Sequence, residues 1–147
     1  ALISPQQALA SGGATAGGAY LLSAKQRYNE RVKSGILGFL ALGGALEKGD
    51  ISTLRDYFTS EEAGSWKDLT SAGYLLANAF RRNSTAAPDS LPSVKAWKKF
   101  AADVEGMTKA LKKKDNAGAL AAYNTAVANL EDYLAKVELP TVAELGS

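Results

Sequence analysis

The sequence contains neither cysteine nor histidine. The absence of cysteine excludes disulfides, thiolate metal sites, iron–sulfur clusters and a cysteine nucleophile. The absence of histidine excludes a Ser-His-Asp triad, a Glu-x-x-His di-iron site, a histidine-ligated haem and an ordinary zinc or copper centre. Catalytic and metal sites that depend on these two residues are therefore ruled out before any motif is considered.

The remaining candidates for chemistry are weak. The one tight acidic pair, Glu61 and Glu62, is adjacent in sequence, and adjacent residues do not share a helix face, so a solvated helix cap is favoured over a metal site. The glycine-rich run at 12–18 follows no strand and lacks the Gly-Lys-Ser/Thr ending that cradles phosphates. We expect a protein that is not an enzyme, with no catalytic residues, no metal and no cofactor.

The sequence also lacks a long hydrophobic run. A membrane-spanning helix needs about 18 or more apolar residues, and the longest candidate, 35–46, contains four glycines. Hydrophobic residues make up 46% of the 147 residues and charged residues 22%, which is typical of one soluble domain. Since the chain opens at Ala1 and shows no hydrophobic leader, we expect a mature form whose targeting segment has been removed.

What the sequence does contain is helical periodicity. Apolar residues recur three and four apart over four segments, at about 19–48, 51–80, 91–114 and 115–138. Lys48 and Gly49 predict the end of the first helix and Asp50 the cap of the next. A polar interruption at 59–64 leaves open whether the second segment is one kinked helix or two. The run 83–92 is predicted to be a loop, and Pro140 is predicted to end the last helix.

Four amphipathic helices joined by short connections predict an all-α fold, an antiparallel up-down-up-down four-helix bundle. We expect a flexible N-terminal arm at 1–18, the bundle at 19–138 and a C-terminal tail at 139–147. The glycines of the first helix predict a kink or close contacts there; they are Gly35, Gly38, Gly43 and Gly44. We expect the largest aromatic residues to form the core rather than a pigment cavity, and they are Phe39, Trp66, Phe80, Trp97 and Tyr123. Since the four stripes can cover one another, we expect a monomer when free.

Charge is unevenly distributed. Residues 95–114 hold seven lysines and two acidic residues, whereas residues 115–147 hold five acidic residues and one lysine. The lysines are either a solvated face or a surface that docks onto an acidic partner. Nucleic acid is the least favoured partner, because the whole chain carries only +2 and the acidic last helix would lie beside the basic one. The candidate partner-binding residues are Arg81, Arg82, Lys95, Lys98, Lys99, Lys109, Lys112, Lys113 and Lys114.

Two segments resemble a known family. One is Trp66-Lys67-Asp68-Leu69, which opens a helix that runs through Tyr74-Leu75-Leu76; the other is the closing helix 120–137, which ends in Tyr-Leu-Ala-Lys-Val. With this order of parts, residues 25 to 137 resemble the PsbQ-like extrinsic subunits of photosystem II, in the version found in diatoms and red algae. The chain lacks the proline-rich N-terminal arm of the plant form, so docking through that arm is not carried over.

The resemblance implies a non-catalytic subunit in the chloroplast thylakoid lumen, peripheral on the thylakoid membrane. Members of the family dock on photosystem II core proteins and on other extrinsic subunits. They stabilise the oxygen-evolving complex without ligating its manganese–calcium cluster, and they help to retain calcium and chloride. On this interpretation the lysines and the two arginines provide the docking surface, and residues 1–18 become ordered on binding. The alternative is a lipid- or small-ligand-binding helical bundle that acts at a membrane surface.

Overall fold

The computed structural model describes residues 12–81 and 87–146, and within these ranges it contains helices and no strand. This confirms the all-α prediction. The helices are α1 (Gly12–Lys48), α2 (Ile51–Thr59), α3 (Trp66–Asn78), the short 3-10 helix η1 (Pro88–Ser90), α4 (Pro92–Lys112), α5 (Asn116–Lys136) and α6 (Val142–Leu145).

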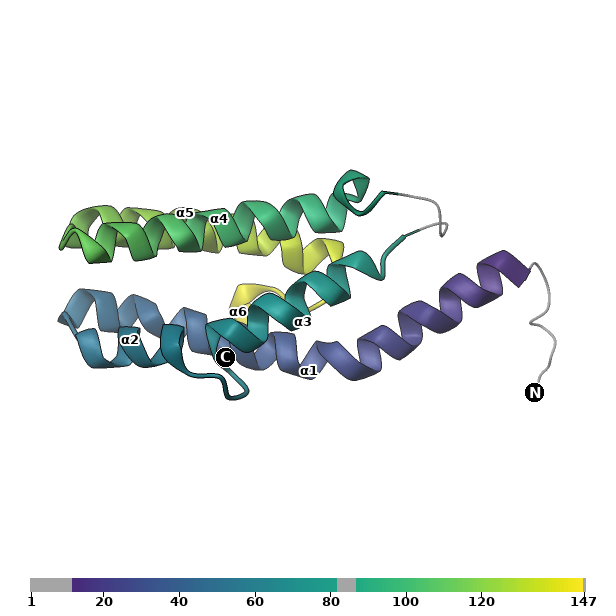
Figure 1. The fold of residues 1–147 in the computed structure, drawn as a ribbon, viewed down its shortest axis with the longest axis horizontal. Helices are drawn as coiled ribbons and strands as arrows, with labels where there is room; N and C mark the ends of the chain where they lie inside the picture. Colours follow the sequence, from purple (N-terminus) through teal and green to yellow (C-terminus); the bar gives the residue numbers. More distant parts are fainter. Residues whose placement is uncertain (1–11, 82–86, 147) are drawn as a thin grey trace.

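The helices pack into two groups that face each other (Figure 1). α4 and α5 form a hairpin, and α1 packs against both α2 and α3. Contacts between α3 and α4, and between α1 and α5, join the two groups. The N-terminal part of α1 extends beyond the other helices in Figure 1, so the core is built on its C-terminal part.

The predicted end of the first helix is confirmed. Gly49 has a φ of +71°, the left-handed conformation that glycine adopts at little cost after a helix. Asp50 then caps α2, because its carboxylate accepts a hydrogen bond of 3.1 Å from the Thr53 amide. The hydrogen bonds from Thr53 hold the pKa of Asp50 below its usual value.

The structure settles the question that the second segment left open. The segment forms two helices, separated by residues 60–65. Ser60 is extended, with a φ of −66° and a ψ of 149°, and Gly64 has a φ of +88°. Ser65 then caps α3 by accepting a 3.3 Å hydrogen bond from the Asp68 amide. The polar interruption therefore ends one helix and starts another.

Both ends of the chain are more helical than we expected. α1 begins at Gly12 rather than at about 19, so residues 12–18 of the predicted arm are helical, and residues 1–11 lie outside the described part. Four of the seven residues 12–18 are glycines, each of which costs about 1 kcal/mol in a helix relative to alanine, so the local sequence does not explain the early start. The tail at 139–147 includes α6, where Thr141 and Glu144 form a reciprocal capping box. α5 ends at Lys136, before Pro140, and the predicted loop at 83–92 includes η1.

A chain of aromatic rings connects the helices inside the core. Phe100 of α4 contacts Phe39 of α1 at 5.2 Å between ring centroids and Trp66 of α3 at 6.0 Å. Trp97 lies 5.6 Å from Phe100 and 5.2 Å from Tyr133 of α5. Phe39 and Trp97 are buried, and the half-buried Trp66, Phe80 and Tyr123 pack against the core, as the core prediction required.

Three tyrosine hydroxyls reach across the core to backbone carbonyls of neighbouring helices. Tyr57 donates to the Gly35 carbonyl at 2.9 Å, Tyr123 to Leu40 at 2.8 Å and Tyr133 to Gly73 at 2.8 Å. These bonds satisfy the phenols, which otherwise would be buried without a partner.

Glycines of α1 lie close to neighbouring parts of the chain, where a larger side chain would not fit. A Cβ atom at Gly35 would lie 2.7 Å from Leu69 Cβ, one at Gly38 would lie 2.5 Å from the Gly64 carbonyl oxygen, and one at Gly43 would lie 2.9 Å from the Tyr123 hydroxyl. The close contacts predicted for the first helix are therefore present at these three glycines. Gly44 has open space around its Cα instead.

Replacing Gly73 by alanine tests the close packing. The added methyl group would lie 2.5 Å from Trp97 Cζ3, inside the aromatic core, so we expect Gly73→Ala to lower the free energy of unfolding by about 1–3 kcal/mol. Gly44→Ala is the matched control, because nothing lies within 4 Å and alanine favours a helix by up to about 1 kcal/mol. Urea unfolding followed by circular dichroism measures both. Equal effects of the two substitutions would contradict the packing.

Alkaline titration tests the buried phenols. Burial raises the pKa of Tyr57 and Tyr133 far above that of a free phenol. Because the folded-state pKa exceeds the unfolded value of about 10, these groups stabilise the fold below pH of about 10, and the stabilisation is lost as pH rises further. We expect part of the tyrosinate absorbance to appear only together with the loss of helical circular dichroism. A tyrosinate titration that is complete while the helical signal is intact would contradict the burial.

Candidate docking surface

The lysines of α4 lie on the face opposite the core. α4 begins with Pro92 at its first position, where the missing amide hydrogen is not needed, and one side of the helix is buried through Val94, Trp97, Phe100 and Val104. The opposite side carries exposed lysines. We define the lysine stripe as Lys95, Lys98, Lys99, Lys109, Lys112, Lys113 and Lys114, all of which are exposed.

The lysine stripe has two ends with a gap between them. Lys95, Lys98 and Lys99 lie near the start of α4, and the other four lysines lie at its end and in the turn that follows. The exposed Ala102 and Gly106 lie between the two ends on the same face, together with Glu105. At 1.5 Å per residue, Lys95 and Lys113 are about 27 Å apart along the helix, so the surface is long and narrow.

Little within the described residues neutralises the lysine stripe. Lys98 pairs with Asp89 of η1 at 2.5 Å, and no other lysine of the stripe forms an ion pair with a carboxylate of the described residues. The four lysines at the C-terminal end of α4 also lie at the negative end of the helix dipole, which favours their charge.

The acidic residues near α5 are engaged elsewhere. As expected, α5 packs beside α4, but its Asp132 pairs with Lys136, one turn along the same helix, at 2.7 Å. Glu131 accepts a hydrogen bond from the Val142 amide at 2.9 Å, and Glu138 pairs with Lys25 of α1. The acidic helix therefore leaves the lysine stripe available to an external partner.

Arg81 lies at the end of α3 and not on α4. Arg81 follows α3 and is half-buried, and its guanidinium donates to the Asn78 side-chain oxygen at 2.6 Å and to the Asn78 carbonyl at 3.2 Å. These bonds hold the Arg81 side chain against the end of α3. Arg82 lies outside the described residues.

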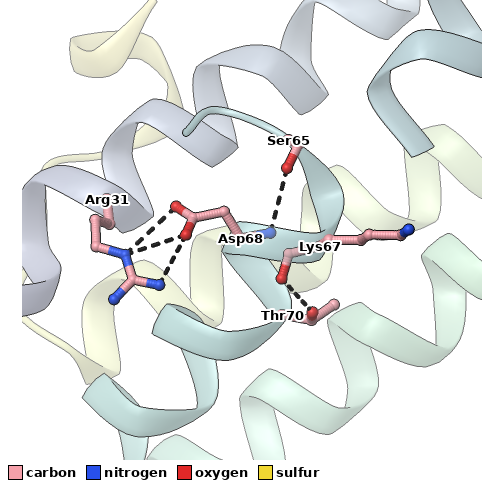
Figure 2. Close-up of polar contacts among 5 residues, drawn as sticks. All are labelled: Arg31, Ser65, Lys67, Asp68 and Thr70. Carbon is pink, nitrogen blue, oxygen red and sulfur yellow. Dashed lines mark hydrogen bonds and ion pairs between the residues drawn. The ribbon is translucent and has the colours of Figure 1, made fainter. Parts of the chain in front are cut away.

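The start of α3, which carries the Trp-Lys-Asp-Leu sequence, connects α3 to α1 through an ion pair. Figure 2 shows Asp68 between Ser65 and Arg31 of α1. Arg31 donates to Asp68 Oδ1 from Nη2 at 2.7 Å and from Nε at 3.2 Å, and these hydrogen bonds raise the pKa of the guanidinium. Thr70 donates to the Lys67 carbonyl at 2.7 Å, while the Lys67 side chain points away from the ion pair (Figure 2). The pair fixes α3 on α1.

A groove opens at the opposite end of α4 from η1. It lies between α2 and the last turns of α4 and has a volume of about 330 Å³. The apolar residues of the groove fall on the periodic stripes that predict packing faces, so the sequence does not indicate a groove there. The groove is defined by the position of α2 relative to α4, and that position depends on the break at 60–65.

Nothing in the described residues indicates a metal centre or a membrane span. No group of three or more acidic, histidine or cysteine residues there is arranged to hold a metal ion. No helix in those residues is long and apolar enough to cross a bilayer.

No family model, no curated protein and no solved structure matches this chain. What the chain does is therefore inferred from its residues and their geometry.

Removing the ion pair between α1 and α3 tests its role. The Arg31 side chain is 39% exposed and that of Asp68 17%, so solvent screens the pair in part, and we expect Asp68→Asn to cost about 1 kcal/mol of stability. The control is Glu30→Gln, which removes the exposed partner of Lys33 and is expected to cost less than about 0.5 kcal/mol. Chemical unfolding of the two variants measures the difference. A cost for Glu30→Gln as large as that for Asp68→Asn would remove the distinction between the pairs.

Proposed function

We propose that this protein is a non-catalytic extrinsic subunit of photosystem II. It docks on the lumenal side of the photosystem, stabilises the oxygen-evolving complex and supports calcium and chloride retention there. Its site of action is the chloroplast thylakoid lumen, peripheral on the membrane, and its partners are core proteins and other extrinsic subunits. The resemblance of residues 25–137 to the PsbQ-like subunits supports this assignment.

The observation that carries the proposal is the lysine stripe. Seven exposed lysines lie along α4 and the turn that follows it, and only Lys98 of the seven pairs with an acid among the described residues. Isolated surface charges contribute little to the stability of a fold, so stability gives no reason to gather them. A row of cations of this kind steers and orients a protein on an acidic partner surface.

The fold proposal is more specific than an all-α bundle. We propose that α1, α4 and α5 are three helices of an up-down-up-down four-helix bundle, and that α2 and α3 together take the place of the fourth. The ion pair of Arg31 with Asp68 and the tyrosine bonds to Gly35 and Gly73 support this arrangement, because they tie the broken helix to its neighbours.

Reconstitution tests the function. Algal photosystem II membranes are stripped of extrinsic proteins with salt, the protein is added back with the other extrinsic subunits, and binding is recorded beside oxygen evolution at limiting calcium and chloride. We expect saturable binding and recovered activity. Absence of binding would overturn the proposal, and flotation with lipid vesicles alone at physiological salt would favour the lipid-binding alternative.

Charge reversal then tests the lysine stripe. We expect Lys99→Glu with Lys109→Glu to weaken binding about tenfold at low salt and to flatten its salt dependence, because long-range attraction is lost. The matched control is Arg27→Glu with Lys67→Glu, two exposed cations on α1 and α3 with the same change of net charge. Equal losses in both double variants would show that total charge, and not the lysine stripe, governs binding.

A further inference from the structure

The groove at the end of α4 has an apolar floor. Eight residues line it, from α2 and from the last turns of α4. Leu54 is buried beneath it, whereas Phe58 and Leu111 are only half-buried. Ile51 is 50% exposed, although it is one of the largest apolar side chains in the helix. Apolar surface that stays in contact with water on a well-packed bundle is favourable to cover.

The rim of the groove is cationic. Arg55 and Lys112 are exposed and contribute to the lining, together with Thr59 and Thr108, and no carboxylate is among the eight lining residues. Neither Arg55 nor Lys112 forms an ion pair within the described residues. The matching occupant therefore combines apolar groups with negative charge.

The length and volume of the groove favour a peptide over a lipid chain as its occupant. The lining residues of α2 span two turns, so the groove is about 12 Å long. A cavity of about 150 Å³ holds one benzene ring, so a groove of about 330 Å³ holds two side chains of that size. A long acyl chain would extend beyond both ends of a groove of this length, whereas a short helix places residues four apart within it.

We propose that this groove receives a short amphipathic helix of a partner protein, which inserts two apolar side chains over Leu54 and Leu111 and sets a carboxylate against Arg55 and Lys112. The inference rests on the proposed docking function and gives it a second contact. Lys112 belongs both to the lysine stripe and to the groove, so one partner surface can engage both.

The experiment measures binding to salt-washed photosystem II membranes, with the other extrinsic subunits present. Thr108→Trp fills the groove without changing charge, and Ile51→Ser removes apolar surface from it. We expect each to weaken binding about tenfold and to leave the salt dependence as in the unmodified protein, because the lost contact is apolar. Leu37→Ser, at a 45% exposed position on α1, is the matched control and is expected to bind normally.

A charge-neutralising pair completes the test. We expect Arg55→Gln, which leaves the lysine stripe intact, to weaken binding about fivefold more than Arg27→Gln, which lies outside the groove. Circular dichroism of each variant establishes that it is folded. Because Ile51 is exposed and Thr108 is half-buried, the two groove substitutions disturb the core to different degrees, and their agreement excludes a folding defect.

Each result has one meaning. If the unmodified protein does not bind the membranes, the docking function fails and the inference fails with it. If it binds and the groove variants bind equally well, the function stands and the inference is wrong. The inference is also wrong if phosphatidylglycerol vesicles bind the unmodified protein but not Thr108→Trp, since the occupant is then a lipid. A dimer on size-exclusion chromatography that Ile51→Ser dissociates would identify a second copy as the occupant and would likewise overturn it.

Discussion

The close approach of α1 and α3 to the tyrosines of neighbouring helices is the constraint on which the rest of the structure depends. Tyr57 and Tyr133 donate to the carbonyls of Gly35 and Gly73, and the second of these glycines lies directly under the Trp97 ring. A Cβ atom at Gly35 would lie 2.7 Å from Leu69 Cβ, and one at Gly73 would lie 2.5 Å from Trp97 Cζ3, so the missing side chains let α3 pack on α1 and the Trp97 ring pack on α3. The cost of glycine within a helix, about 1 kcal/mol each, is offset by the buried hydrogen bond at each glycine and by the close contact with Leu69 at Gly35 and with the Trp97 ring at Gly73.

This arrangement fixes the position of α3 and therefore also that of α2. α3 is held on α1 by the Arg31–Asp68 pair and under α4 by Trp97, and residues 60–65 join it to α2. α2 packs on α1 and α3, and the groove lies between it and the last turns of α4. The groove is thus a consequence of the helix break. An unbroken second helix would follow a different line across the bundle.

Local signals in the sequence predicted most of the helices. Gly49, Asp50 and the three- and four-residue spacing of apolar residues act within one or two turns, so the end of α1, the start of α2 and the extent of α4 and α5 follow from them directly. The break at 60–65 was left open because polar residues tolerate both a kink and a termination. The proline-containing tail suggested a loop, whereas the Thr141–Glu144 capping box forms the helix α6. The glycines at 12–18 also suggested a loop, and no local signal in that segment predicts the early start of α1.

Of the two candidate surfaces, the lysine stripe could be predicted from the sequence and the groove could not. The lysine stripe follows from the sequence because exposure along one helix is periodic. The sequence does not show that the acidic residues near α5 leave the lysines unpaired, since this depends on Glu131 and Glu138 having partners on α6 and α1. The groove joins residues of α2 to residues of α4 that are at least 49 positions away in the sequence, and it is defined only when α2 is in place. A charged stripe alone attracts many acidic surfaces, because long-range attraction does not depend on shape. An apolar groove with a defined length adds the shape dependence, and this makes the end of α4, where the two meet at Lys112, the place where specificity for one partner arises.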